Sequence, residues 1–142
     1  MILLDTNVLI DFACYEFDPS EPYAASMLSR AELELGIHGA PTVALREERK
    51  HRLILLDGWI EWLSFDRAAS EGYGQLAART SLTGARLRNK DALIAGQAYG
   101  RGMALMTVNT SDFAPFAALL TILAPTRRPD SEAVADTLGG TG

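Results

Sequence analysis

The chain has 142 residues and a formal net charge of −5 at pH 7, with 48% hydrophobic and 22% charged residues. This length suits one domain with its own hydrophobic core, and the composition excludes a disordered or fibrous protein. The negative charge argues against broad, nonspecific affinity for nucleic acid. It still allows a nucleic-acid enzyme whose acidic residues gather in one site.

Cys14 is the only cysteine, so an internal disulfide is impossible and a reducing compartment is expected. The start of the chain lacks the basic residues and cleavage site of a signal peptide. No apolar run approaches the ~20 residues that span a bilayer. We therefore expect a soluble, cytoplasmic protein without membrane contact.

The first eleven residues, MILLDTNVLID, place an acid at the end of a buried strand. Residues 2–4 form an unbroken apolar run, which is typical of a strand covered on both faces. Asp5 ends the run, and Thr6 or Asn7 can cap a helix that continues to Phe12. Because open α/β sheets bind ligands at the carboxyl ends of their strands, Asp5 is a candidate site residue.

A second acid follows in residues 23–37, which the pattern predicts to be mostly helix. Glu32 shares a helical face with Leu28 and Leu35. An inward carboxylate is costly unless it is paired or bound to a cation, so Glu32 is a candidate as well. Glu34 points the other way and is expected to be solvated.

The middle of the chain contains predicted secondary structure without a candidate site acid. Residues 43–56 predict a helix whose residues 46–52 form a charged, solvated face. Residues 60–65 suggest a short strand, and Asp66 is a good N-cap for a helix that breaks near residues 83–84.

A third acid lies in the helix that Asn89 can cap. Asp91 shares the apolar face of this helix with Ile94 and Ala98, in the first turn, where the helix dipole favours a negative charge. The alternative is an ordinary N-terminal acid without a role in a site.

A second buried strand is predicted at residues 103–108, and Asn109 and Asp112 follow it directly. Strands joined by helical crossovers pair in parallel, so this loop can lie beside Asp5. Residues 119–123 suggest a last strand.

The end of the chain changes character. From Pro125 onward it holds prolines and glycines with few large apolar residues. We therefore expect a folded domain at residues 1–124 and a mobile tail at residues 125–142.

The predicted topology could bring Asp5, Glu32, Asp91 and Asp112 together from four segments. Two carboxylates ~4 Å apart repel by roughly 4 kcal/mol at an effective dielectric constant near 20. Such a cluster must hold protons or a cation. Oxygen ligands suit Mg²⁺ or Mn²⁺, which serve phosphate chemistry, whereas the histidines and the cysteine lack the spacing of a zinc site.

Four ordered blocks, LLDTNVLID, SRAELELGI, NKDALIAGQA and LMTVNTSDF, resemble the PIN-domain nucleases and above all the VapC-type toxins of bacterial toxin–antitoxin pairs. The resemblance implies an α/β fold with three layers, α/β/α, and a mostly parallel central sheet. It implies that Asp5, Glu32 and Asp91 bind the metal. Many members carry a fourth acid where Asn109 stands, so Asp112 is the nearby candidate to replace it.

The resemblance also implies the reaction and the partners. The reaction is Mg²⁺- or Mn²⁺-dependent hydrolysis of RNA phosphodiesters without a covalent enzyme intermediate, and the partners are a cognate antitoxin and a second copy of the chain in a homodimer. Four side chains would orient the acids or water: Thr6, Asn7, Thr107 and Asn109. Basic residues would contact the RNA backbone, namely Arg86, Arg88 and Lys90, with Arg46, Arg49, Lys50, Arg52 and Arg79 as further candidates.

An antitoxin would need a docking surface. Apolar Leu53, Leu56, Trp59 and Trp62 lie near the basic residues 46–52 and suit an amphipathic partner segment, or else they face the core.

Two other functions compete with the toxin. An aspartate-nucleophile phosphatase would need a second acid two residues after Asp5, where Asn7 stands. A PIN fold that lost its fourth acid could instead bind RNA or a partner without cutting it.

Overall fold

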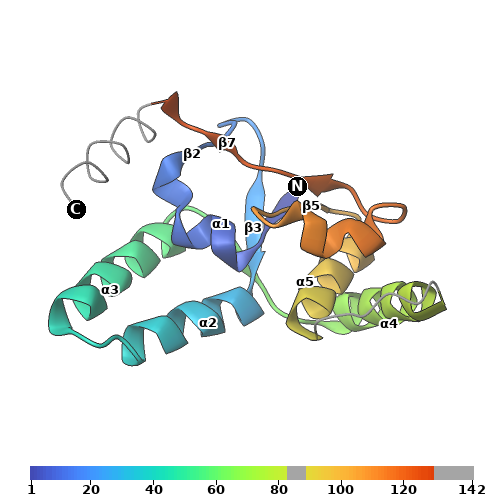
Figure 1. Cartoon of the computed structure of the whole chain (residues 1–142), viewed down its shortest axis with the longest axis horizontal. Coiled ribbons are helices and arrows are strands. Elements are labelled where there is room, and N and C mark those ends of the chain that lie inside the picture. The colour runs from blue at the N-terminus through green and yellow to red at the C-terminus, as the bar shows by residue number, and fades with distance from the viewer. Residues whose placement is uncertain (83–88, 130–142) are drawn as a thin grey trace.

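The computed structural model describes residues 1–82 and 89–129. A parallel five-stranded sheet of order β4-β3-β1-β5-β6 forms the centre of the molecule (Figure 1). Its strands are β1 (Ile2–Leu4), β3 (Tyr23–Ser26), β4 (Glu61–Leu63), β5 (Ala104–Met106) and β6 (Ile122–Leu123). Because β1 is the central strand, Asp5 follows it at the middle of the sheet's carboxyl edge.

Helices cover both faces of the sheet, as the sequence predicted. One layer holds α1 (Thr6–Ile10), α2 (Met27–His38) and α3 (Val43–Asp57), and the other holds α4 (Arg67–Leu82) and α5 (Asn89–Gly100) (Figure 1). Two 3₁₀ segments, η1 (Phe12–Cys14) and η2 (Thr110–Phe116), follow α1 and β5. Among the described residues, no helix is long and apolar enough to cross a membrane.

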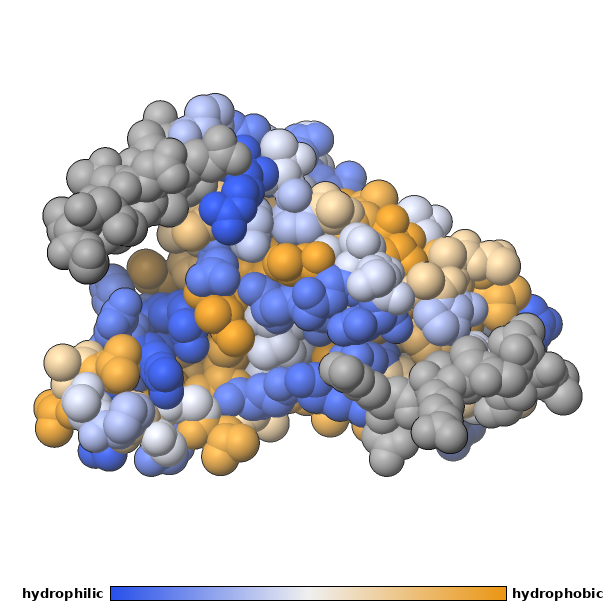
Figure 2. Space-filling view, in the orientation of Figure 1, coloured by the Kyte–Doolittle hydropathy of each residue, from blue (hydrophilic) through white to orange (hydrophobic). Residues whose placement is uncertain are grey.

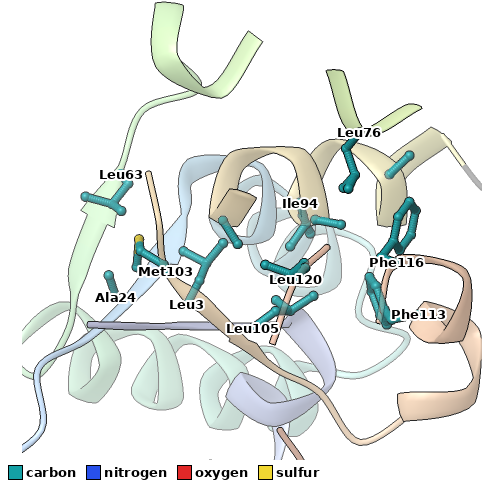
Figure 3. Packing of buried hydrophobic residues seen from close by; sticks show 13 residues of the cluster. Leu3, Ala24, Leu63, Leu76, Ile94, Met103, Leu105, Phe113, Phe116 and Leu120 are labelled. Carbon is teal, nitrogen blue, oxygen red and sulfur yellow. The ribbon is translucent and has the colours of Figure 1, made fainter. Parts of the chain in front are cut away.

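The two layers have separate hydrophobic cores, because side chains alternate across a strand. Leu3 and Leu105 pack in one cluster with Ile94 of α5 (Figure 3). Leu4 packs in the other with Leu33 of α2. All five side chains are at most 3% exposed, so each strand residue belongs to one core or the other.

The helix predicted over residues 23–37 was wrong at its start. Tyr23–Ser26 is strand β3, which pairs with β1 on one side and β4 on the other. Ala24 and Ala25 carry little intrinsic strand preference, yet both are fully buried between helices, and this packing decides their conformation. Helix α2 begins at Met27, where the Ser26 hydroxyl accepts a hydrogen bond from Leu28 N at 3.1 Å.

Other predicted elements are confirmed with shifted ends. Helix α3 spans Val43–Asp57 and β4 lies within residues 60–65. Asp66 accepts a hydrogen bond from Ala69 N at 3.0 Å and so caps α4. The last strand is shorter than predicted, since β6 holds only Ile122–Leu123 and η2 precedes it.

The two layers are fixed internally by different contacts. The α2–α3 pair is tied by Arg30, whose Nε and Nη2 donate to Asp57 at 3.1 and 3.0 Å, while Trp62 Nε1 donates to the same carboxylate at 2.7 Å. The Arg30 hydrogen bonds lower the pKa of Asp57, and Trp62 adds to this effect against a smaller opposing effect of burial.

Helices α4 and α5 pack backbone to backbone. A Cβ atom on Gly72 of α4 would overlap the backbone of α5, and a Cβ atom on Gly100 of α5 would overlap the backbone of α4. A Cβ atom on Gly96 of α5 would overlap Tyr73 of α4. Glycine is therefore required at this crossing, which sets the position of α5 and of the acid in its first turn.

The predicted tail begins with ordered structure. Strand β7 (Thr126–Arg127) pairs antiparallel with β2 (Tyr15–Glu16), and Arg128 Nε donates to Tyr15 O at 2.8 Å. The sequence did not predict strand β7 after Pro125, because a short strand that is held by backbone hydrogen bonds has no hydrophobic pattern. Residues 130–142 of that tail lie outside the described residues.

Candidate active site

A cleft of about 210 Å³ opens at the carboxyl edge of the sheet. Its lining holds the four acids that the sequence singled out, each from a different element. Asp5 follows β1, Glu32 lies on α2, Asp91 lies in the first turn of α5 and Asp112 lies in η2. The cleft is lined by Asp5, Thr6, Asn7, Ile10, Glu32, Lys90, Asp91, Asn109, Asp112 and Phe113.

Asp5 is the most buried of the four acids, at 4% exposure. Its carboxylate accepts hydrogen bonds from Thr6 N at 2.8 Å and from Thr107 Oγ1 at 2.9 Å. Asp5 is thus itself the N-cap of α1, and the prediction of Thr6 or Asn7 as the cap was wrong. Burial raises the pKa of Asp5, and Asp91 raises it further, whereas these hydrogen bonds and Lys90 oppose the shift.

Thr107 holds Asp5 through a fully satisfied hydroxyl. It is completely buried at the end of β5, donates to Asp5 and accepts from Asn7 Nδ2 at 3.3 Å and from Asn109 N at 3.2 Å. Asn7 Oδ1 in turn accepts from Val108 N at 3.2 Å. Asn7 thereby ties α1 to the loop after β5, and three of the four predicted orienting residues, Asn7, Thr107 and Asn109, form one network.

Glu32 faces the cleft, but not on the helix face that the sequence predicted. The buried face of α2 holds Ser29, Leu33 and Ile37, whereas Leu35 is 74% exposed. The carboxylate of Glu32 contacts the Thr6 hydroxyl, which lies 3.0 Å from Glu32 Oε1 and 2.9 Å from Ser29 Oγ. Ser29 was missed because a small polar residue on a helix carries no distinguishing signal.

Lys90 occupies the cleft rather than the surrounding surface. Its Nζ lies 2.7 Å from Glu32 Oε2, and the hydrogen bond to Glu32 raises the pKa of Lys90. The sequence suggested Lys90 only as an RNA contact, since 58 residues separate the two partners. Arg86 and Arg88 lie outside the described residues.

Apart from the nitrogen atoms of Lys90 and of the side-chain amides, the polar side-chain atoms that line the cleft and could bind a metal ion are all oxygens. That set matches the preference of Mg²⁺ and Mn²⁺. In the described part of the chain, no three Asp, Glu, His or Cys side chains converge closely enough to hold an ion as they stand. In the cleft, Asp5 is held by Thr107 and Glu32 by Lys90. Residues of the right type thus surround the cleft, with one carboxylate neutralised by an ammonium group.

The exposure of the residues on α3 and directly after it corrects the predicted docking residues. Leu53 and Leu56 are 6% and 0% exposed and belong to the core, so they offer nothing to a partner. Trp59 is 40% exposed and Ile54 is 67% exposed. Figure 2 shows a band of hydrophilic residues across the centre of this face, and apolar residues mixed with hydrophilic ones over the α2–α3 pair at the lower left.

Known proteins share this sequence pattern and this fold. The PIN domain family matches residues 2–119. Plasmid stability protein StbB of Pseudomonas syringae pv. tomato is 33% identical over 141 residues, covering 88% of this chain and 98% of that protein. VapBC-5 of Mycobacterium tuberculosis, a member of the VapBC family of toxin–antitoxin systems, is 28% identical with a TM-score of 0.71, covering 89% of this chain and 97% of that one.

A third similar protein supports the fold alone. VapBC2 of Rickettsia felis, solved with a DNA fragment from its promoter, is 22% identical with a TM-score of 0.71, covering 88% of this chain and 99% of that one. The mostly parallel sheet with flanking helices agrees with these structural matches. The chain therefore belongs to the PIN domain family.

Proposed function

We propose that the chain is a Mg²⁺- or Mn²⁺-dependent endoribonuclease and the toxin of a toxin–antitoxin pair. One observation carries the nuclease proposal: Asp5, Glu32, Asp91 and Asp112 come from four separate elements and line one cleft. Four carboxylates in one cleft repel one another and need a cation. Membership of the PIN domain family supports the same chemistry.

The chain's own groups would prepare the site for an oxygen-binding cation. Asp5 is held in one orientation by Thr6 N and Thr107, and Glu32 by the Thr6 hydroxyl. When bound, the cation would activate a water molecule and neutralise the charge that develops on the phosphate. Asp112, in place of the usual acid at Asn109, would add the last negative charge.

RNA would enter over the exposed side of the cleft. Lys90 is 52% exposed there, and Arg86 and Arg88 precede it in the sequence. Cationic side chains beside a cleft that cuts phosphodiesters give contacts to the RNA backbone independent of base sequence.

The role as a toxin is supported by the likeness to VapBC-5, a member of a toxin–antitoxin family, and to a plasmid stability protein. A cytoplasmic ribonuclease harms its host unless a partner covers the site. The groove between α1 and α3, of about 420 Å³, combines apolar Leu55 with Arg49 and Arg52 and suits an amphipathic antitoxin segment. We also expect a homodimer, for which light scattering of the purified chain is the test.

One observation favours a second function, a PIN fold that binds RNA without cutting it. Asn109 stands in the cleft where many family members carry an acid, and an amide binds a hard cation more weakly than a carboxylate does.

Cleavage of RNA by the purified chain separates these functions. We expect cleavage that requires Mg²⁺ or Mn²⁺, stops with EDTA and falls at least about a hundredfold in Asp5→Asn and Glu32→Gln, since both remove a carboxylate from the site. Glu34→Gln is the matched control, because Glu34 lies on the same helix and pairs with Arg30 and His38 outside the cleft. RNA binding without cleavage would support the second function.

The toxin role needs its own test. Expression of the chain alone should stop growth, and co-expression with the small protein encoded beside it should restore growth and give a complex that co-purifies. Harmless expression of a chain that cleaves RNA in vitro would refute the toxin role and leave the nuclease proposal standing.

A further inference from the structure

We propose that Lys90 is a tethered cation that competes with the divalent metal for Glu32 and thereby sets the metal affinity of the site. The inference rests on the proposed metal-dependent function and adds a regulator to it. Lys90 is thus a positioning residue, which acts on the metal through Glu32.

The contacts at Glu32 leave it no unoccupied carboxylate oxygen. Oε2 lies 2.7 Å from the ammonium of Lys90, and Oε1 lies 3.0 Å from the hydroxyl of Thr6. A metal ion at Oε2 would lie next to the ammonium group on the same oxygen, and the repulsion between the two cations favours departure of the ammonium. The side chain of Lys90 is 52% exposed, so it can move into solvent when displaced.

The place of Lys90 in the fold explains why it reaches this acid. Lys90 precedes Asp91 in the first turn of α5, and Asp5 and Asp91 both lie close enough to act on its charge. Its ammonium group is therefore a counter-charge for three acids at once. It lowers the repulsion between them in the absence of metal, and it must be displaced or repelled when a divalent cation binds.

Calorimetric titration of the purified full-length chain with MnCl₂, without RNA, tests the proposal. Lys90→Gln removes the competing charge and should bind Mn²⁺ roughly tenfold more tightly, the effect expected of one partly exposed, charge-assisted contact. Lys90→Arg keeps a cation that can pair with Glu32 and should stay near wild-type affinity. Lys50→Gln is the matched control, since Lys50 pairs with Glu47 on α3 and should not alter Mn²⁺ affinity.

A double-mutant cycle shows whether the effect passes through Glu32. In a Glu32→Gln background the ammonium has no carboxylate to hold, so Lys90→Gln should no longer raise Mn²⁺ affinity tenfold. An equal gain in both backgrounds would mean that Lys90 acts only as a distant charge, and would overturn the proposal. Unchanged Mn²⁺ affinity in Lys90→Gln would overturn it too, and weaker RNA binding by the same variant would then leave Lys90 with the role of an RNA contact alone.

Failure of the proposed function gives a different result. If neither the wild type nor Lys90→Gln binds Mn²⁺, the metal-dependent function fails and the inference fails with it. If the wild type binds Mn²⁺ and Asp5→Asn abolishes binding, the site stands, and the Lys90 variants alone decide the inference. Circular dichroism of each variant checks that the fold is intact.

Discussion

The hydroxyl of Thr107 is the part of the site whose removal has the most defined consequence. Thr107→Val keeps the shape of the side chain and deletes the donor to Asp5 Oδ2 and the acceptor for Asn7 and Asn109. Thr107 is completely buried and Asp5 is 4% exposed, so water does not readily replace the lost contacts. Leaving such buried groups without partners costs about 2 kcal/mol, which corresponds to a fall in melting temperature of roughly 6 °C for a chain of this size.

The pH dependence of this loss distinguishes it from a packing defect. Burial raises the pKa of Asp5 above the ordinary value of an aspartate, and the Thr107 hydrogen bond opposes that shift. A raised pKa gives stability that is present below the unfolded value and lost as pH rises through the folded value. Thr107→Val raises the pKa further, so its destabilisation should be largest at pH 7 and shrink as the pH falls toward 4.

Urea unfolding in EDTA, followed by circular dichroism at several pH values, measures this effect. Thr107→Ser is the control, because it keeps the hydroxyl and loses only a methyl group, about 1 kcal/mol at every pH. If Thr107→Val were as stable as Thr107→Ser at pH 7, or lost the same free energy at every pH, the role assigned to the hydroxyl would be refuted.

Three more predictions follow from other contacts. Asp112→Asn should reduce Mn²⁺ affinity and RNA cleavage more than Asn109→Ala, and the reverse order in titration and cleavage assays would exchange their roles. Gly96→Ala should destabilise the chain by about 2–3 kcal/mol because a Cβ overlaps the facing helix, whereas Gly74→Ala, which meets open space, should stabilise it by about 0.5–1 kcal/mol in urea unfolding. Asp57→Asn should cost less than about 1 kcal/mol at pH 7 after solvent screening. The Asp57 carboxyl has a lowered pKa, so this cost should vanish as pH falls through that pKa, and a pH-independent cost would contradict the assignment.

The sequence predicted the elements whose hydrophobic pattern is local. Strand β1 is an apolar run that ends sharply at Asp5, and this local pattern is enough to predict an acid directly after a buried strand. Strand β5 follows the same rule. Parallel pairing was predicted because strands joined by helical crossovers pair in parallel. The three-layer arrangement was predicted from the resemblance to the PIN-domain nucleases.

The features that the sequence missed depend on distant partners. Ala24 and Ala25 are strand residues only because β1 and β4 flank them. Leu35 is exposed although its spacing suggested an inward face, because the buried face of α2 is the one that holds Ser29, Leu33 and Ile37. Lys90 and Glu32 are 58 residues apart in the sequence, and no local sequence pattern predicts that they pair. The metal roles of the four acids and the RNA contacts remain predictions.

The placement of the helices in two layers, one on each face of the sheet, has a consequence for the motions of the protein. Glu32 is carried by the layer of α1–α3, and Lys90 with Asp91 is carried by the layer of α4 and α5. The cleft thus lies between the two helical layers, and a ligand bound in it would contact residues of both layers and link them. Occupancy by Mn²⁺ should therefore slow amide hydrogen exchange in α2 and in the first turn of α5 together, although the two segments belong to different hydrophobic cores.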